Sequence, residues 1–381
     1  MKKIILPLAL VGCCSFPSAN SAEIDFSGFA TFAGGITTDS EETYGEFNDE
    51  LNFSQNSLIA LQASADLGNG WGVTTQLMSR GSDGWEIGAE WAFVSYDADN
   101  DWRILFGRQR APFYVYSDFL DVSYAYHWIS PPDGVYSLPF DTFDGIGVIK
   151  NSAVGSFDST FHATFGRNRG ELDAQGVVAE SDFSNTFSAS WTLTRDWFTV
   201  RASYARTNFT VFDQSVGQLA DAWRSAGFSA VGDGIEINDD TGDFKGIGII
   251  IDYENFLLVS EYTEINPENS LFAPNDSYYL SLGYRTDGGM FHLTYGADEN
   301  EPNFGLLDGV PSGLDPALDG LILLTQGTFQ GLSEDSSFVT VGYKWDLDSP
   351  VSLKLEATAF SDDIDPNNDA TLLQFAIVTV F

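Results

Sequence analysis

Residues 351–381 read VSLKLEATAFSDDIDPNNDATLLQFAIVTVF, and this stretch decides the fold. Successive residues of a β-strand point to opposite faces of the sheet. In 351–360 apolar residues alternate with Ser352, Lys354, Glu356 and Thr358. An acid-rich break at 361–369 follows, and alternation resumes in 370–381 up to the terminal Phe381. The stretch therefore predicts two strands of about ten residues, each with an apolar and a polar face, joined by a loop.

The same alternation recurs along the whole chain. Gly and Asn-Asp turn signals, or longer polar stretches, separate the segments that carry it. Sixteen segments fit the pattern, at about 24–36, 51–67, 71–80, 86–97, 102–108, 142–150, 157–167, 183–194, 197–206, 245–253, 256–264, 278–286, 290–298, 337–346, 351–360 and 370–381.

The connections between these segments alternate between short and long. The short ones lie at 68–70, 98–101, 151–156, 195–196, 254–255, 287–289 and 347–350. The long ones centre on 38–50, 81–85, 109–141, 168–182, 207–244, 265–277, 299–336 and 361–369. Two of the long ones contain helical spacing, at 213–225 and 315–326. Seven turns and eight loops connect sixteen antiparallel strands and leave both termini on the short-turn side.

A soluble β-sandwich also alternates, but it does not usually keep this order of connections through sixteen strands. Transmembrane barrels keep this alternation of short and long connections, and their strands have ~9–11 residues. Aromatic residues stand at or beside the start of many strands, as in a girdle at a membrane interface: Trp71, Trp102, Phe157, Phe198, Phe256 and Phe291. The sequence therefore predicts an all-β protein, an antiparallel transmembrane barrel of about sixteen strands with short periplasmic turns and long extracellular loops.

Composition and the N-terminus narrow the function classes. The chain has 381 residues, a net charge of −38 and 14% aromatic residues. The aromatic content argues against a disordered acidic chain, and the charge argues against nucleic acid as a partner. Residues 1–22 have the charged, apolar and small-residue order of a secretory signal peptide, with cleavage after Ser21 or Ala22. A lipoprotein signal that modifies Cys13 is the rival interpretation. We expect 23–381 to form the barrel.

The terminal Phe381 on an amphipathic last strand completes a resemblance to Gram-negative outer-membrane porins of the sixteen-stranded, general-diffusion type. In that family this residue is the assembly signal for the barrel-insertion machinery. The resemblance implies a homotrimer in the outer membrane, surrounded by its lipid. It also implies a water-filled channel for passive diffusion of ions and small hydrophilic solutes, without a cofactor.

The resemblance also implies that the third loop, 109–141, folds into the pore. Acids on this loop, Asp118 and Asp121, would face a basic wall of Arg80, Arg108 and Arg110 and create a transverse field. Strand parity adds further lumen-facing residues, namely Glu90, Arg103, Arg201, Glu261, Arg285, Lys354 and Glu356.

Parity conflicts with two of these assignments. Trp102, Ile104 and Phe106 are expected to face lipid, so strict alternation would send Arg108 and Arg110 outward as well. We expect a bulge at Gly107 to reset the parity. The alternative is that the strand has already left the membrane. The many Tyr and Trp residues of the third loop indicate either a stacking surface for solutes or packing against the wall.

Acidic loops predict a preference for cations, which they concentrate at the channel mouth. Two alternatives remain: a porin specific for a sugar or an aromatic solute, and a plugged barrel that acts as an adhesin or structural surface protein. We expect no enzyme and no metal site. The sequence has three histidines, no nucleophile motif and no cluster with metal-ligand spacing, and both cysteines lie in the signal peptide.

Overall fold

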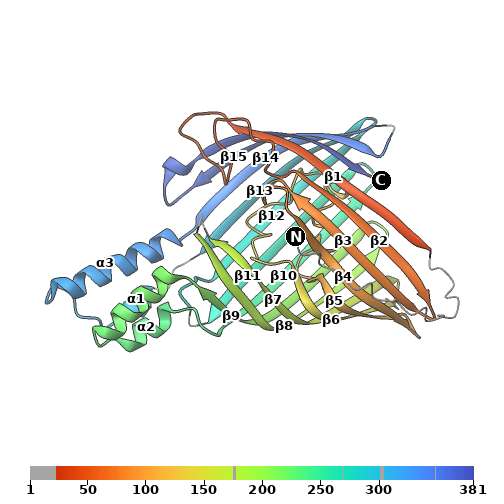
Figure 1. Ribbon diagram of the computed structural model, residues 1–381. Helices are drawn as coiled ribbons and strands as arrows, with labels where there is room; N and C mark the ends of the chain where they lie inside the picture. Colours follow the sequence, from red (N-terminus) through yellow and green to blue (C-terminus); the bar gives the residue numbers. More distant parts are fainter. Residues whose placement is uncertain (1–22, 175–176, 269, 301–303, 348) are drawn as a thin grey trace, which may run out of the picture.

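The computed structural model describes residues 23–381 except 175–176, 269, 301–303 and 348, so the predicted signal peptide lies outside the described residues. Sixteen strands form one closed barrel in which each strand pairs antiparallel with the next and β1 pairs with β16 (Figure 1). This confirms the predicted fold. The strands are β1 (Ile24–Thr37), β2 (Leu58–Gly68), β3 (Trp71–Arg80), β4 (Ile87–Ala98), β5 (Trp102–Arg110), β6 (Thr142–Val154), β7 (Phe157–Ala174), β8 (Val177–Arg195), β9 (Phe198–Phe212), β10 (Asp240–Tyr253), β11 (Phe256–Glu268), β12 (Asn275–Thr286), β13 (Gly289–Asn300), β14 (Asp335–Asp346), β15 (Val351–Asp362) and β16 (Ala370–Val380).

Strand β12 shows how the alternating pattern builds the wall. Leu280 and Leu282 are 42% and 48% exposed on the outer face. Between them Ser281 is fully buried on the inner face, as is Tyr279. Because lipid offers no hydrogen bonds, the closed ladder must satisfy every backbone group, and the exposed apolar side chains provide the lipid-facing surface.

Several strand boundaries differ from the prediction, and the largest differences lie in two regions. The expected loop at 168–182 is largely strand, since β7 and β8 continue as a paired ribbon that an Arg167–Asp182 ion pair spans. The expected strand start at 51 is instead a turn. There the Asn52 side chain accepts hydrogen bonds from the backbone N–H groups of Ser54 and Gln55, and β2 begins at Leu58.

The extracellular loops carry three α-helices beyond one end of the barrel (Figure 1). They are α1 (Gln214–Ser225), α2 (Ser229–Ile235) and α3 (Pro316–Gly331), which confirms both predicted helical segments. Trp223 of α1 donates from Nε1 to Thr325 Oγ1 of α3 over 2.8 Å, which joins the two loops. No helix in the described part of the chain is long and apolar enough to cross a membrane. Four short 3₁₀ helices complete the elements: η1 (Ser117–Phe119), η2 (Ser123–Ala125), η3 (Phe304–Leu307) and η4 (Pro366–Asn368).

The C-terminus closes the barrel. Gly28 and Phe381 exchange two backbone hydrogen bonds of 2.7 and 2.9 Å. A Cβ atom at Gly28 would lie 2.5 Å from the Phe381 ring and 2.7 Å from the Ala60 carbonyl oxygen. The terminal ring therefore rests on a strand position that has room only for glycine.

Candidate functional site: the pore constriction and its vestibules

The third loop, residues 111–141, lies inside the barrel (Figure 1). Its backbone N–H groups bind wall carboxylates on β11 and β15, with Val115 N 2.8 Å from Glu261 and Ile129 N 2.8 Å from Glu356. Toward the opposite wall, Val122 packs near Phe29, Ala60 and Met78. The loop thus reaches across the lumen and narrows it.

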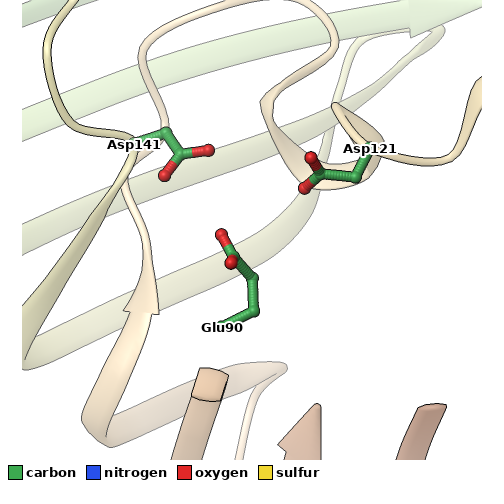
Figure 2. Close-up of side chains that lie close together, drawn as sticks. All are labelled: Glu90, Asp121 and Asp141. Carbon is green, nitrogen blue, oxygen red and sulfur yellow. The ribbon is translucent and has the colours of Figure 1, made fainter. Parts of the chain in front are cut away.

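Two arginines and three carboxylates meet where the loop approaches β3, β4 and β5. Arg80 lies 3.1 Å from Glu90 and 3.0 Å from Asp121. Arg110 is 2.8 Å from Glu90 and 3.2 Å from Asp141, and it also pairs with Asp121. Figure 2 shows the carboxylates of Glu90, Asp121 and Asp141 pointing toward one another. With two positive and three negative groups, this constriction cluster carries one net negative charge.

The constriction cluster differs in geometry from the expected one. The structure brings Arg80, Arg110 and Asp121 together as predicted, but Asp121 touches both arginines instead of facing them across open water. The three carboxylate groups lie within 4.8 Å of one another, the spacing of a cation site. The guanidinium groups of Arg80 and Arg110 already bind these carboxylates. Glu90 was expected only as a general lumen residue, and Asp141 was not anticipated.

The assignment of Arg108 to the basic wall was wrong. Arg108 lies on the outer face of the barrel with Ile104 and Phe106, which are 40% and 66% exposed, and forms two 3.1 Å contacts with Asp144 of β6. Pairing between β5 and β6 is continuous, so Gly107 resets no parity. The register shift is in β4 instead, because Gln76 pairs with Trp91 and the next residue with Ala89.

That register shift in β4 leaves Glu90 as the extra residue, and its side chain is buried within the barrel. Arg110 is the last residue of β5, and its side chain turns into the barrel, where it is 5% exposed. A lipid-facing Arg costs less near the interface than the ~2–4 kcal/mol at the midplane. The Asp144 carboxylate further offsets the charge of Arg108.

Asp118, the second predicted loop acid, faces water. Its side chain is 64% exposed, and its nearest basic partner is Arg201 of β9, with Oδ2 3.8 Å from Nη1. Asp118 therefore keeps most of its charge available to a passing ion, whereas Asp121 is neutralised.

Several predicted lumen residues hold the third loop in place. Lys354 Nζ donates to the carbonyl oxygen of Ser123 over 2.6 Å, to its hydroxyl over 2.9 Å, and to the carbonyl oxygen of Trp128. Glu356 accepts the Ile129 N–H described above, and Glu261 accepts both the Val115 N–H and the Tyr136 hydroxyl at 2.8 Å. These wall charges tether the backbone of the loop.

Two other predicted lumen residues pair along the wall near the short-turn side. Arg103 binds Asp97 at 2.5 and 2.8 Å, and Arg285 binds Asp252 at 2.6 and 2.7 Å. Arg103 and Asp97 line a cavity, while Arg285 crosses from β12 to β10. Both pairs are solvent-exposed, so we expect each to contribute little to stability.

Two cavities among the described residues form the vestibules on either side of the constriction. The outer vestibule, of about 570 Å³, is lined by extracellular loops 1, 7 and 8, by residues 130–134 of the third loop and by the β13–β16 wall. Its described lining residues include six acids and no Lys, Arg or His; the acids are Glu46, Asp133, Asp298, Glu334, Glu356 and Asp362. The inner vestibule, of about 630 Å³, is lined mainly by β2–β5, with residues of β1, β6, β7, the turn at 69–70 and the third loop. It mixes both signs: Asp25, Asp66, Asp97, Asp118, Arg103, Arg110 and His162.

Comparisons with known proteins identify proteins of the same architecture. Residues 8–365 match the family model of Gram-negative porins. No curated protein matches the sequence significantly. Similar solved structures include OmpF of Salmonella typhi in complex with daunomycin, at 13% identity and a TM-score of 0.60, over 94% of this chain and 98% of that one.

Two further structures share the fold. The anion-selective porin from Comamonas acidovorans has 13% identity and a TM-score of 0.57, over 94% of this chain and 100% of that one. The trimer form of OmpT, an outer membrane protein of Vibrio cholerae, has 13% identity and a TM-score of 0.56, over 94% and 99%. The family match covers most of the sequence, and the chain therefore belongs to the Gram-negative porins, a channel protein of the outer membrane and not an enzyme.

Proposed function

We propose that this porin conducts ions and small hydrophilic solutes by passive diffusion and prefers cations. The outer vestibule carries the proposal, because six carboxylates and no basic group line its described surface. A cavity lined by one sign of charge concentrates the opposite ion at its mouth. The net negative constriction cluster and the exposed Asp118 continue this bias inward. Selection then rests on size exclusion and electrostatic filtering.

The anion-selective relative indicates that the sign of the ion preference depends on the lining residues. It shares the fold at 13% identity, so the fold does not determine which ion passes. Purified protein in a planar bilayer under a tenfold KCl gradient tests the sign directly. We expect a reversal potential on the cation-selective side, and one on the anion-selective side would refute the preference.

Liposome swelling with small neutral sugars tests diffusion itself. We expect swelling rates that fall smoothly with solute size, as for a general channel. Flux that saturates for one sugar or aromatic solute would instead support the specific-porin alternative. An absence of swelling would support the plugged, adhesin-like alternative.

Assembly and targeting form a second part of the proposal. We infer that residues 1–22 are removed on export, that the barrel-insertion machinery recognises Phe381, and that three copies form a homotrimer. The trimer form of the Vibrio cholerae relative supports the last point. Light scattering of the purified protein distinguishes one chain from three, and mass spectrometry locates the mature N-terminus.

A further inference from the structure

A third cavity, of about 260 Å³, lies against the inner wall near the extracellular ends of β7 to β11. Six phenylalanines line it and define what we call the phenylalanine pocket: Phe113, Phe140, Phe183, Phe209, Phe244 and Phe272. Two of them, Phe113 and Phe140, stand at the two ends of the third loop. The pocket therefore sits between the loop and the wall.

The rings form a connected set. Phe113 lies 5.6 Å from Phe140 and 5.4 Å from Phe244 between ring centroids. Phe183 continues the set, 4.5 Å from Phe140 and stacked on Phe209 at 6.1 Å. Edge-to-face and offset arrangements at these separations are the favourable ones for aromatic pairs. Five of the six rings are less than 10% exposed, while Phe272 at the rim is only partly buried.

The pocket offers no charge to a ligand. Its only charged lining residues among those described are Arg206 and Asp243, and these pair with each other at 2.8 Å. Arg206 alternates along β9 with the inward-facing Ala205, and Tyr204 of the exposed face also binds Asp243. Both charged side chains therefore lie on the outer face of the barrel and pair with each other.

Of the polar side chains that line the pocket, Ser137 is exposed to solvent and the other described ones already have partners. Thr186 and Thr207 share a 2.7 Å hydrogen bond, and Asn275 donates to Asp298 over 2.7 Å. A ligand is therefore held by apolar contact and needs to satisfy no buried donor or acceptor. This contrasts with the acid-lined outer vestibule in the same barrel.

We propose that the phenylalanine pocket binds small uncharged aromatic compounds of one or two fused rings. A dry apolar cavity of about 150 Å³ accepts benzene, so a cavity of about 260 Å³ has room for a second ring. Ligand sites are typically concave and lined by aromatic side chains. Binding here does not require that the channel conduct, so this inference goes beyond the diffusion role.

Calorimetric titration of the purified, detergent-solubilised protein with 2-naphthol tests the proposal, with 2-naphthalenesulfonate as the charged comparator. Wild-type protein is expected to bind one naphthol per chain and to bind the sulfonate at least tenfold more weakly. The variant Ala205→Phe fills the pocket from its wall and is expected to weaken naphthol binding at least tenfold. Ala202→Phe is the matched control, because Ala202 lies on the exposed face of the same strand.

A second variant, Phe272→Ala, removes a rim ring without filling the cavity and is expected to weaken naphthol binding about threefold to tenfold. It keeps the test decisive if Ala205→Phe does not fold. Three results would overturn the proposal: no saturable binding to wild type, equal binding of naphthol and its sulfonate, or equal binding by the pocket variants and Ala202→Phe. None of these results would bear on the reversal potential or on liposome swelling.

Discussion

Arg80 Nη2 lies 3.0 Å from Asp121 Oδ1, so a guanidinium at the end of β3 holds a carboxylate in the middle of the third loop. The Asp121 side chain is 12% exposed and also pairs with Arg110, whose side chain is 5% exposed. Burial raises the pKa of Asp121, but attraction to Arg110 and Arg80 outweighs it and leaves that pKa below its usual value. The constriction is therefore held together by charges that neutralise one another.

Neutralising Asp121 should loosen the third loop. In Asp121→Asn the buried Arg110 loses one of its three carboxylate partners and keeps Glu90 and Asp141, so we expect a cost below the about 1–3 kcal/mol of a fully unpaired buried group. We expect a lower unfolding free energy in denaturant and noisier single-channel currents. Asp118→Asn is the control, since Asp118 is exposed and its ion pair with Arg201 is 3.8 Å long. Equal effects of the two substitutions would contradict the tethering role.

Ion preference should depend on the outer vestibule. The double variant Glu46→Gln with Asp133→Asn removes two of its six acids, and we expect the reversal potential in a KCl gradient to move toward zero. The control, Asp49→Asn with Glu50→Gln, removes two acids of the first loop that do not line this cavity. If both pairs shift the potential equally, the net charge of the loops, and not the vestibule, sets the preference.

Cation preference should also fall as the pH drops through about 6. Burial raises the pKa of Asp141 to about 6, against the opposing attraction of Arg110. A carboxyl with a raised pKa is ionised above that value and neutral below it. The constriction cluster should therefore pass from one net negative charge at pH 8 to none at pH 5. Reversal potentials across this range check the prediction. Asp141→Asn should weaken the transition near pH 6 without abolishing it, because burial also raises the pKa of Asp133 in the outer vestibule to about 6. An unchanged profile in Asp141→Asn would exclude Asp141 as a source.

Barrel closure should depend on Gly28. The substitution Gly28→Val places a Cβ atom 2.5 Å from the Phe381 ring and 2.7 Å from a backbone oxygen, so a strand must shift. We expect a smaller folded fraction after refolding into detergent, measured by circular dichroism and gel migration. Gly88→Val is the control, because a Cβ atom there meets nothing within 4 Å. Refolding of Gly28→Val to the control level would contradict this packing.

Much of the fold could be predicted because the two-residue alternation of side chains along a strand is visible in a short stretch of sequence. The paired ribbon at the end of β7 and the start of β8 was missed because its residues are largely polar. Residues such as Glu171 and Asp182 stand where an apolar strand face was expected. The constriction was predicted in part: Arg80, Arg110 and Asp121 meet, but Arg108 points outward. The outward position of Arg108 follows from uninterrupted alternation along β5, whereas the register shift that turns Glu90 inward lies in β4 and leaves no signal in the sequence pattern.

The phenylalanine pocket could not be predicted for a related reason. Its rings come from the third loop, three strands and the loop before β12, and nothing in their spacing along the chain brings them together. Position on one strand face follows from alternation. Contact across the lumen depends on the path of the third loop, which only tertiary structure defines.

The pairing of β1 with β16 joins the strands that are farthest apart in the sequence. A chain that lacks β16 would leave β1 and β15 as open sheet edges, and unpaired backbone groups are not tolerated in lipid. An incomplete translation product could therefore not be integrated as a stable wall, however sound its other strands are. The topology thus makes synthesis of β16 a condition for a closed wall in the membrane.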